Sequence, residues 1–261
     1  MNWLRVFFHG GLTSYRALFA WINPWVFLPM LVAYPVFQTV FYVYLGRAAD
    51  VADDAFFVIG NSFVAAAVTG LFGMGQAIAG ERRFQTLPVL LASPASRLAL
   101  FLGRAVPTIV NGFVVAVITF VLGAAMVGVN IDRNAYGGLA LALAASCFAC
   151  AALGLCVGSL TFRTRSITVF ADTIGALMLL ITGANVPIGR LPDTLQNIAD
   201  YVPLTHGIHA ARLLAAGASV ADALPQIRDE LLVGVAYFTA GLLLLRHFER
   251  DGRRAGSFER F

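Results

Sequence analysis

The sequence predicts an all-α polytopic membrane protein with six transmembrane helices in a single transmembrane domain of 261 residues. Three observations support this prediction. Hydrophobic residues make up 59% of the chain and charged residues only 12%, about half the charged share of an ordinary soluble domain. The apolar residues gather in six runs, most of them long enough to cross a bilayer. The arginines concentrate in every second segment between these runs, which places most of them on one side of the membrane.

Residues 1–24 precede the first apolar run and form an amphipathic pattern. Apolar side chains from Trp3 to Phe19 recur at helical spacing, with Arg5, His9 and Arg16 on the opposite face. This pattern predicts an interfacial helix that lies on the inner leaflet, either as a plain anchor or as a docking surface for a cytoplasmic partner.

Residues 25–184 hold spans one to five, in the apolar runs Trp25–Leu45, Phe56–Ala79, Phe101–Val129, Tyr136–Leu160 and Ile167–Ala184. Residues 185–230 form a long connection, span six occupies residues 231–247, and residues 248–261 form a cytoplasmic tail. The apolar part of span six, Leu231–Leu245, is short. We therefore expect its flanking residues, Glu230 and Arg246, to reach toward the lipid headgroups.

The arginines predict the orientation of the spans. Thirteen arginines fall on the side of the N-terminus and five on the other side, so the positive-inside rule places both termini in the cytoplasm. The net charge of +4 then follows from topology and from contact with anionic membrane lipid, and no nucleic-acid partner is expected. All 18 basic residues are arginine, which excludes a Walker A motif because that motif needs a lysine.

The loop after the second span begins with charged residues and continues with an apolar patch. Leu87, Leu90 and Leu91 share one face of a short helix that Pro88 opens. The start of this loop is too polar for the acyl chains, so the helix is suited to a protein groove. A helix that floats at the membrane interface is the alternative.

This loop resembles the loop between spans two and three of type-2 ABC exporter membrane subunits, where a coupling helix enters a cleft of a separate ATPase. The resemblance implies a set of ATPase-coupling residues: Glu81, Arg82, Arg83, Thr86, Leu87, Leu90, Leu91, Ser93, Pro94 and Arg97. Gln85 and Pro88 depart from the family pattern, in which Gly and Glu are usual. A charged contact to the ATPase at position 88 is therefore not implied.

Residues 185–230, hereafter the gate region, are long enough to hold structure of their own. Their short, proline-bounded apolar segments cannot span, so they must re-enter the membrane or lie along its outer surface, supported by protein. The same family has paired outer gate helices here. The resemblance implies the outer gate residues Pro187, Leu191, Pro192, Tyr201, Pro203, Leu204 and Arg212.

The function implied by the resemblance is that of a permease subunit of an ABC exporter in the bacterial cytoplasmic (inner) membrane. Two copies of this chain, or this chain and a homologous permease, would pair with two ATPase subunits that hold ATP and Mg²⁺. The chain itself would bind no cofactor and would not be an enzyme. An apolar dimer interface with sparse polar groups such as Asn61 suits an amphiphilic or hydrophobic cargo, for example an antibiotic, a drug or a natural product.

Two alternatives stay open for the function. The cargo of an ATP-driven exporter could instead be a lipid-linked glycan or polysaccharide. A secondary transporter that works without ATP is less favoured, because the two halves of the chain show no convincing inverted repeat. Antibiotic resistance is expected if the exported cargo is an antibiotic or a drug.

One carboxylate lies inside a predicted span. Asp172 is about six residues into span five, and Arg104 near the inner end of span three is its most plausible partner. A structural ion pair and a gating role are both open. Cys147 and Cys150 lie among small residues that favour close helix packing, and His206 and His209 lack a nearby third ligand, so no metal site is predicted.

Overall fold

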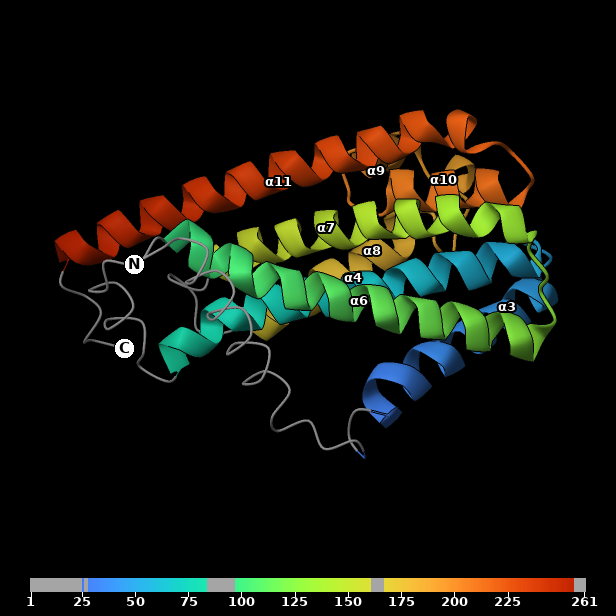
Figure 1. The fold of residues 1–261 in the computed structure, drawn as a ribbon, viewed down its shortest axis with the longest axis horizontal. Coiled ribbons are helices and arrows are strands. Elements are labelled where there is room, and N and C mark those ends of the chain that lie inside the picture. Colours follow the sequence, from blue (N-terminus) through green and yellow to red (C-terminus); the bar gives the residue numbers. More distant parts are fainter. Residues whose placement is uncertain (1–24, 26–27, 84–96, 161–166, 256–261) are drawn as a thin grey trace.

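The computed structural model describes residue 25 and residues 28–83, 97–160 and 167–255. Within these ranges the chain is helical, as the sequence predicts, and contains no strand. The long helices lie side by side, and each runs in the opposite direction to the long helix before it in the chain, so that the neighbours α4, α7 and α11 are parallel (Figure 1). We call the end of the bundle that holds the gate region the gate end. The opposite end, where α4 finishes and α6 starts, is the coupling end.

The elements that carry this fold are long helices joined by short ones. In chain order they are η1 (Leu28–Ala33), α3 (Tyr34–Ala49), α4 (Asp54–Arg83), α6 (Arg97–Val127), η2 (Arg133–Ala135), α7 (Tyr136–Leu160), α8 (Ile167–Ile181), η3 (Ile188–Arg190), α9 (Asp193–Ala199), α10 (Thr205–Ala215) and α11 (Val220–Ala255). Helix α11 therefore includes the end of the gate region as well as the predicted sixth span.

Several turns at the gate end have local causes in the sequence. Gly128, Gly183 and Gly217 adopt positive φ angles of 83°, 80° and 93°, and they follow α6, α8 and α10 respectively. Ser219 and Asp222 then cap the start of α11: the Asp222 carboxylate accepts from the Ser219 backbone N–H at 3.1 Å, and the Ser219 hydroxyl accepts from the Asp222 N–H at 3.3 Å. The Ser219 hydroxyl also donates to the Asp222 carboxylate at 2.6 Å. These hydrogen bonds hold the pKa of Asp222 below its ordinary value.

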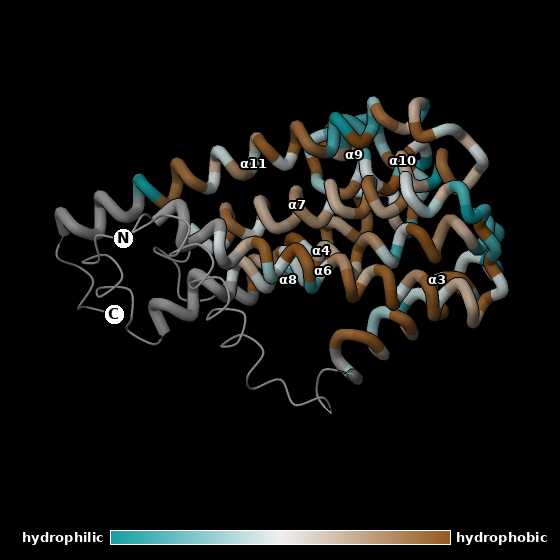
Figure 2. The backbone as a smooth tube through the Cα atoms, in the orientation of Figure 1, coloured by the Kyte–Doolittle hydropathy of each residue, from teal (hydrophilic) through white to brown (hydrophobic). Residues whose placement is uncertain are grey.

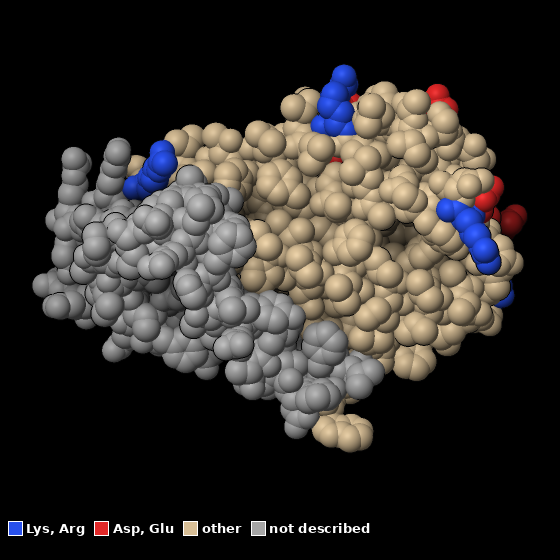
Figure 3. Space-filling model, in the orientation of Figure 1, with Lys and Arg blue, Asp and Glu red and all other residues tan. Residues whose placement is uncertain are grey.

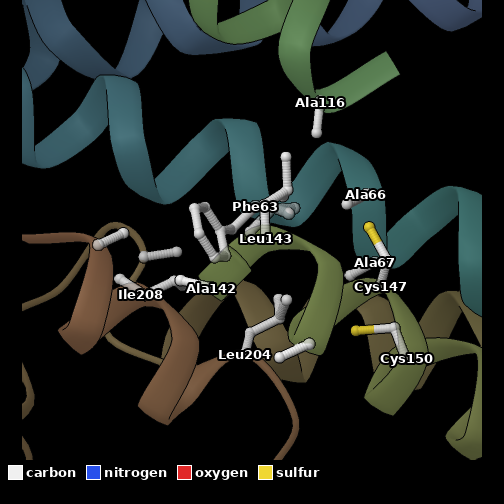
Figure 4. Packing of buried hydrophobic residues seen from close by; sticks show 14 of the residues in the cluster. Phe63, Ala66, Ala67, Ala116, Ala142, Leu143, Cys147, Cys150, Leu204 and Ile208 are labelled. Carbon is white, nitrogen blue, oxygen red and sulfur yellow. The ribbon is translucent and has the colours of Figure 1, made fainter. Parts of the chain in front are cut away.

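Helix α7 forms the centre of the bundle, between α4 and α11 (Figure 1). Its buried side chains are mostly Ala, Gly, Ser and Cys, which allow neighbouring helices to approach closely. At Gly154, for example, an added Cβ would lie 2.8 Å from the Leu71 carbonyl oxygen of α4. The thiols of Cys147 and Cys150 are buried and free within this packing, as Figure 4 shows, so the packing role predicted for them is confirmed.

Three helical segments are long and apolar enough to cross a membrane within the described ranges: Asp54–Gly75, Ala105–Val127 and Arg133–Leu160. They correspond to predicted spans two, three and four. Val169–Ile181, in predicted span five, is a shorter apolar helix. Spans one, five and six of the expected six therefore stay predictions.

The surface pattern agrees with a membrane protein. Hydrophobic residues colour the long helices along most of their length, while hydrophilic residues gather near α9 and the turns at the gate end (Figure 2). On the face shown in Figure 3, most charged side chains lie along the margins of the described surface, including its upper edge, and leave a broad, largely uncharged area between them. Helix α6 exposes a row of valines on this kind of surface: Val106, Val110, Val114, Val117 and Val121.

Candidate functional site

The gate region folds into three short helices, η3, α9 and α10, packed against the end of the bundle. Leu204 and Ile208 are fully buried and join the hydrophobic core with Phe63 of α4 and Leu143 of α7 (Figure 4). The core thus extends from the long helices into the gate region. Helix α10 is held there by apolar packing and also by two charged side chains, one fully buried and one partly buried.

The first buried charge is Glu230 of α11, whose side chain has no exposed surface. One carboxylate oxygen accepts a hydrogen bond from the Leu204 backbone N–H at 2.8 Å, and the other accepts from the Gly207 N–H at 3.0 Å. The Ser146 hydroxyl of α7 faces the same carboxylate but does not have hydrogen-bonding geometry. Glu230 is therefore tied to the backbone at the start of α10.

This arrangement supplies a cap that α10 does not provide itself. Leu204 occupies the cap position with a φ of 84°, its side chain cannot accept a hydrogen bond, and the first turn contains no acidic residue. The first turn of a helix leaves four N–H groups without partners inside the helix, and the helix dipole favours a negative charge there. The carboxylate of Glu230 satisfies two N–H groups near this helix start from a different helix.

Glu230 corrects an expectation of the sequence analysis. The sequence suggested that this residue reaches toward the lipid headgroups, because it directly precedes an apolar run. In the structure α11 begins ten residues earlier, at Val220, and Glu230 points into protein. The side-chain pattern carries no signal for this contact, because its partners are backbone N–H groups.

The second charged side chain is that of Arg212 of α10, which is partly buried and which the sequence analysis assigned to the outer gate. Its Nη2 donates to the carbonyl oxygens of Phe56 at 3.2 Å, Gly183 at 2.8 Å and Ala184 at 3.3 Å. The guanidinium carbon also lies 3.4 Å from the centroid of the Phe56 ring, a cation–π contact. Arg212 thereby joins α10 to the start of α4 and to the turn after α8.

Burial lowers the pKa of Arg212 to about 9, while the charge of Asp53 acts in the opposite direction. A guanidinium with this pKa keeps its positive charge at neutral pH. Its Nε is buried without a hydrogen-bond partner. The Arg212 contact is thus made by one nitrogen shared among three carbonyl groups, and it uses only part of the side chain's capacity.

A third contact fastens the turn after α8. The Nδ2 atom of Asn61 in α4 donates to Oδ1 of Asn185 at 2.7 Å, and both residues are buried. Gly60 lies beside this pair, and a side chain there would overlap the Ala184 carbonyl oxygen. The sequence analysis placed Asn61 at an interface with a second copy. In the structure its side chain is instead buried inside one chain.

The family assignment rests on comparison with known proteins. The ABC-2 type transporter family matches residues 12–214, which is more than three quarters of the chain. The chain belongs to the ABC-2 type transporter family. The resemblance stated from the loop and gate motifs is therefore confirmed, and the matched range includes the coupling loop and most of the gate region.

Individual relatives of this ABC-2 type transporter chain are more distant. It is 25% identical over 178 residues to the inner membrane transport permease YhhJ of Escherichia coli strain K12, and to the protein of the same name in Shigella flexneri. The matched part covers 66% of this chain and 46% of each relative. The chain thus spans about half the length of the relatives it matches.

The structure places some of the residues that the sequence analysis of this ABC-2 type transporter chain predicted to couple to an ATPase. Glu81, Arg82 and Arg83 form the last turn of α4, and Arg97 is the first residue of α6. Thr86, Leu87, Leu90, Leu91, Ser93 and Pro94 lie outside the described residues. The backbone therefore locates both ends of the coupling segment at the coupling end of the bundle.

The remaining gate residues occupy varied environments. Pro187 and Pro192 directly precede η3 and α9, where proline is well tolerated. Leu191, Pro203 and Leu204 are buried, whereas Tyr201 is exposed. The structure thus brings Leu204 and Arg212 into contacts with the long helices and leaves Tyr201 on the surface.

The other polar groups singled out from the sequence do not form a site with each other in the described structure. Asp172 lies on an exposed face of α8, and the side chain of Arg104 is outside the described part, so their ion pair stays a prediction. His206 contacts Gln226 and the Asp200 carbonyl, at 3.1 and 2.9 Å. Among the residues searched, no group of three or more His, Cys, Asp or Glu side chains could hold a metal ion.

Proposed function

We propose that this chain is the membrane-spanning permease subunit of an ATP-driven ABC exporter. The observation that carries the proposal is the family match over residues 12–214, because it includes predicted spans one to five, the coupling loop and most of the gate region. The absence of lysine from the whole sequence supports an ATP site on a separate polypeptide. The working unit is two permeases, as a homodimer or with a homologous chain, and two ATPase subunits.

In this proposal the coupling segment is cytoplasmic and the gate region lies on the outer side, with both termini inside. ATP-driven closure of the ATPases pushes the coupling segment, tilts the long helices and opens a path between the two permeases. Exposed apolar faces on α3, α6 and α8 support a cargo that is amphiphilic or hydrophobic. We propose an antibiotic, drug or natural product, with a lipid-linked glycan as the second cargo class.

The coupling assignment is tested with the double variant Leu90→Arg plus Leu91→Arg in proteoliposomes that contain the ATPase. We expect the variant to insert into the membrane but to lose export of a fluorescent amphiphilic dye, because two charges would exclude the segment from an apolar cleft. Gly256→Arg plus Ser257→Arg is the matched control, since it adds the same charges to the predicted cytoplasmic tail. Normal export by the Leu90/Leu91 variant would contradict the assignment.

The same preparation separates the function classes. An exporter moves the dye only with the ATPase and ATP present, whereas a secondary transporter moves it without either. Stimulation of ATP hydrolysis by a lipid-linked oligosaccharide, but not by amphiphilic dyes, would favour the glycan cargo.

A further inference from the structure

Two charged side chains hold α10 to its neighbours, and their contacts differ in quality. Toward α11, two separate oxygens of Glu230 each receive one backbone N–H, and the side chain is completely buried. Toward α4 and the turn after α8, the partly buried Arg212 shares a single nitrogen among three carbonyl oxygens. A charge-assisted hydrogen bond is stronger when it is short, unshared and shielded from water.

The contact with α11 also continues along the helix. Ala223, Ile227 and Glu230 are buried residues spaced four and three positions apart, so they share one face of α11, and this helix packs directly against α10. Gln226 adds a hydrogen bond to His206 on the same side, at 3.1 Å. Helix α10 therefore packs against two turns of α11 through both apolar and polar contacts.

Helix α11 extends from this contact to the other end of the molecule. Its 36 residues make a helix about 54 Å long at 1.5 Å per residue. It passes α7 and ends near the coupling end, where α4 finishes and α6 starts (Figure 1). Its proline, Pro225, precedes Glu230, so no proline interrupts the helix between Glu230 and Ala255.

We propose that Glu230 is a positioning residue that makes α10 and α11 one moving unit, so that α10 separates from α4 and the turn after α8 at the Arg212 contact. A tilt of α11 that begins at the coupling end then carries α10 with it. This inference rests on the proposed function, because it assigns the step at which an ATP-driven movement reaches the gate region.

The test measures two distances with spin labels, in a background where the three buried cysteines are replaced by alanine. One pair joins exposed positions on α10 and α11, His209→Cys with Leu232→Cys. The other joins α10 to the end of α3, which packs on α4, through His209→Cys with Ala49→Cys. In the complex with its ATPase, we expect trapped ATP to leave the first distance unchanged and to lengthen the second.

A charge variant tests Glu230 itself in the isolated permease, without the ATPase. Glu230→Gln should broaden the distance distribution between His209→Cys and Leu232→Cys, since each N–H binds a different carboxylate oxygen and the amide replaces one of them with an NH2 donor. Asp229→Asn is the matched control, because it removes the same charge at the neighbouring position. The Asp229 side chain pairs with the exposed Arg228. In the complex, Glu230→Gln should keep ATP hydrolysis but lose most dye export. A variant that had only lost its structure would lose both activities.

The outcomes of these measurements separate the role of Glu230 from the exporter proposal. Lengthening of the α10–α11 distance with ATP, or a Glu230→Gln distribution identical to that of wild type, would overturn the inference and leave the exporter proposal intact. A complex in which neither distance responds to ATP would refute the exporter proposal and the coupling role of Glu230 together. If Glu230→Gln does not fold, the two wild-type distances still decide the question.

Discussion

The substitution Gly60→Ala tests the contact between α4 and the turn after α8. A Cβ at this buried position would overlap the Ala184 carbonyl oxygen and would lie 2.9 Å from both the carbonyl carbon and the Cα of Ala184. All three are backbone atoms, which cannot rotate away as a flexible side chain can. The added methyl group must therefore push the turn away from α4.

The expected cost follows from three effects. Overpacking a well-packed site costs about 1–3 kcal/mol. Displacement of Ala184 also weakens its contact with Arg212 and the neighbouring Asn61–Asn185 hydrogen bond, at roughly 0.5–1.5 kcal/mol each. Replacement of glycine by alanine inside a helix returns about 1 kcal/mol. The net loss is about 1–5 kcal/mol, which corresponds to a fall in melting temperature of roughly 2–20 °C for a domain of this size.

The assay is the temperature at which half of the detergent-solubilised protein loses its monodisperse elution peak after heating. Gly175→Ala on α8 is the matched control, because a Cβ there meets nothing within 4 Å. We expect this control to match wild type or to exceed it slightly. Equal midpoints for the Gly60 and Gly175 variants would refute the reasoning from the Ala184 contact.

Two further variants test the contacts of α10. In Gly207→Ala, the new methyl group would overlap the Ser146 hydroxyl oxygen, and we expect the free energy of unfolding to fall by about 1–3 kcal/mol. Adding Ser146→Ala should restore most of this loss. Strictly additive losses in the double-mutant cycle would contradict the contact. Arg212→Gln should cost about 2–4 kcal/mol, because it removes a charged hydrogen-bond donor and a cation–π contact with Phe56. Hydrogen exchange should then accelerate in residues 182–186 while the middle of α7 stays protected. Unchanged exchange in that turn would contradict the role assigned to the Arg212 contact.

Much of the helical framework could be predicted from the sequence because its causes are local. The apolar runs that become α4, α6 and α7 reveal themselves through length and composition alone. The small residues around Cys147 and Cys150 likewise predicted close packing, because a helix face without bulky side chains has few other ways to bury its surface. The coupling and gate motifs identified the family because they follow a recognisable order along the chain.

The environment of Glu230 was decided by the tertiary structure. Its partners are the backbone N–H groups of Leu204 and Gly207, and backbone groups leave no mark in a side-chain pattern. Asn61 shows the same limit, since its partner Asn185 is 124 positions away. Hydropathy reports how costly a polar group is in lipid, whereas only the packed fold determines which buried donor or acceptor offsets that cost.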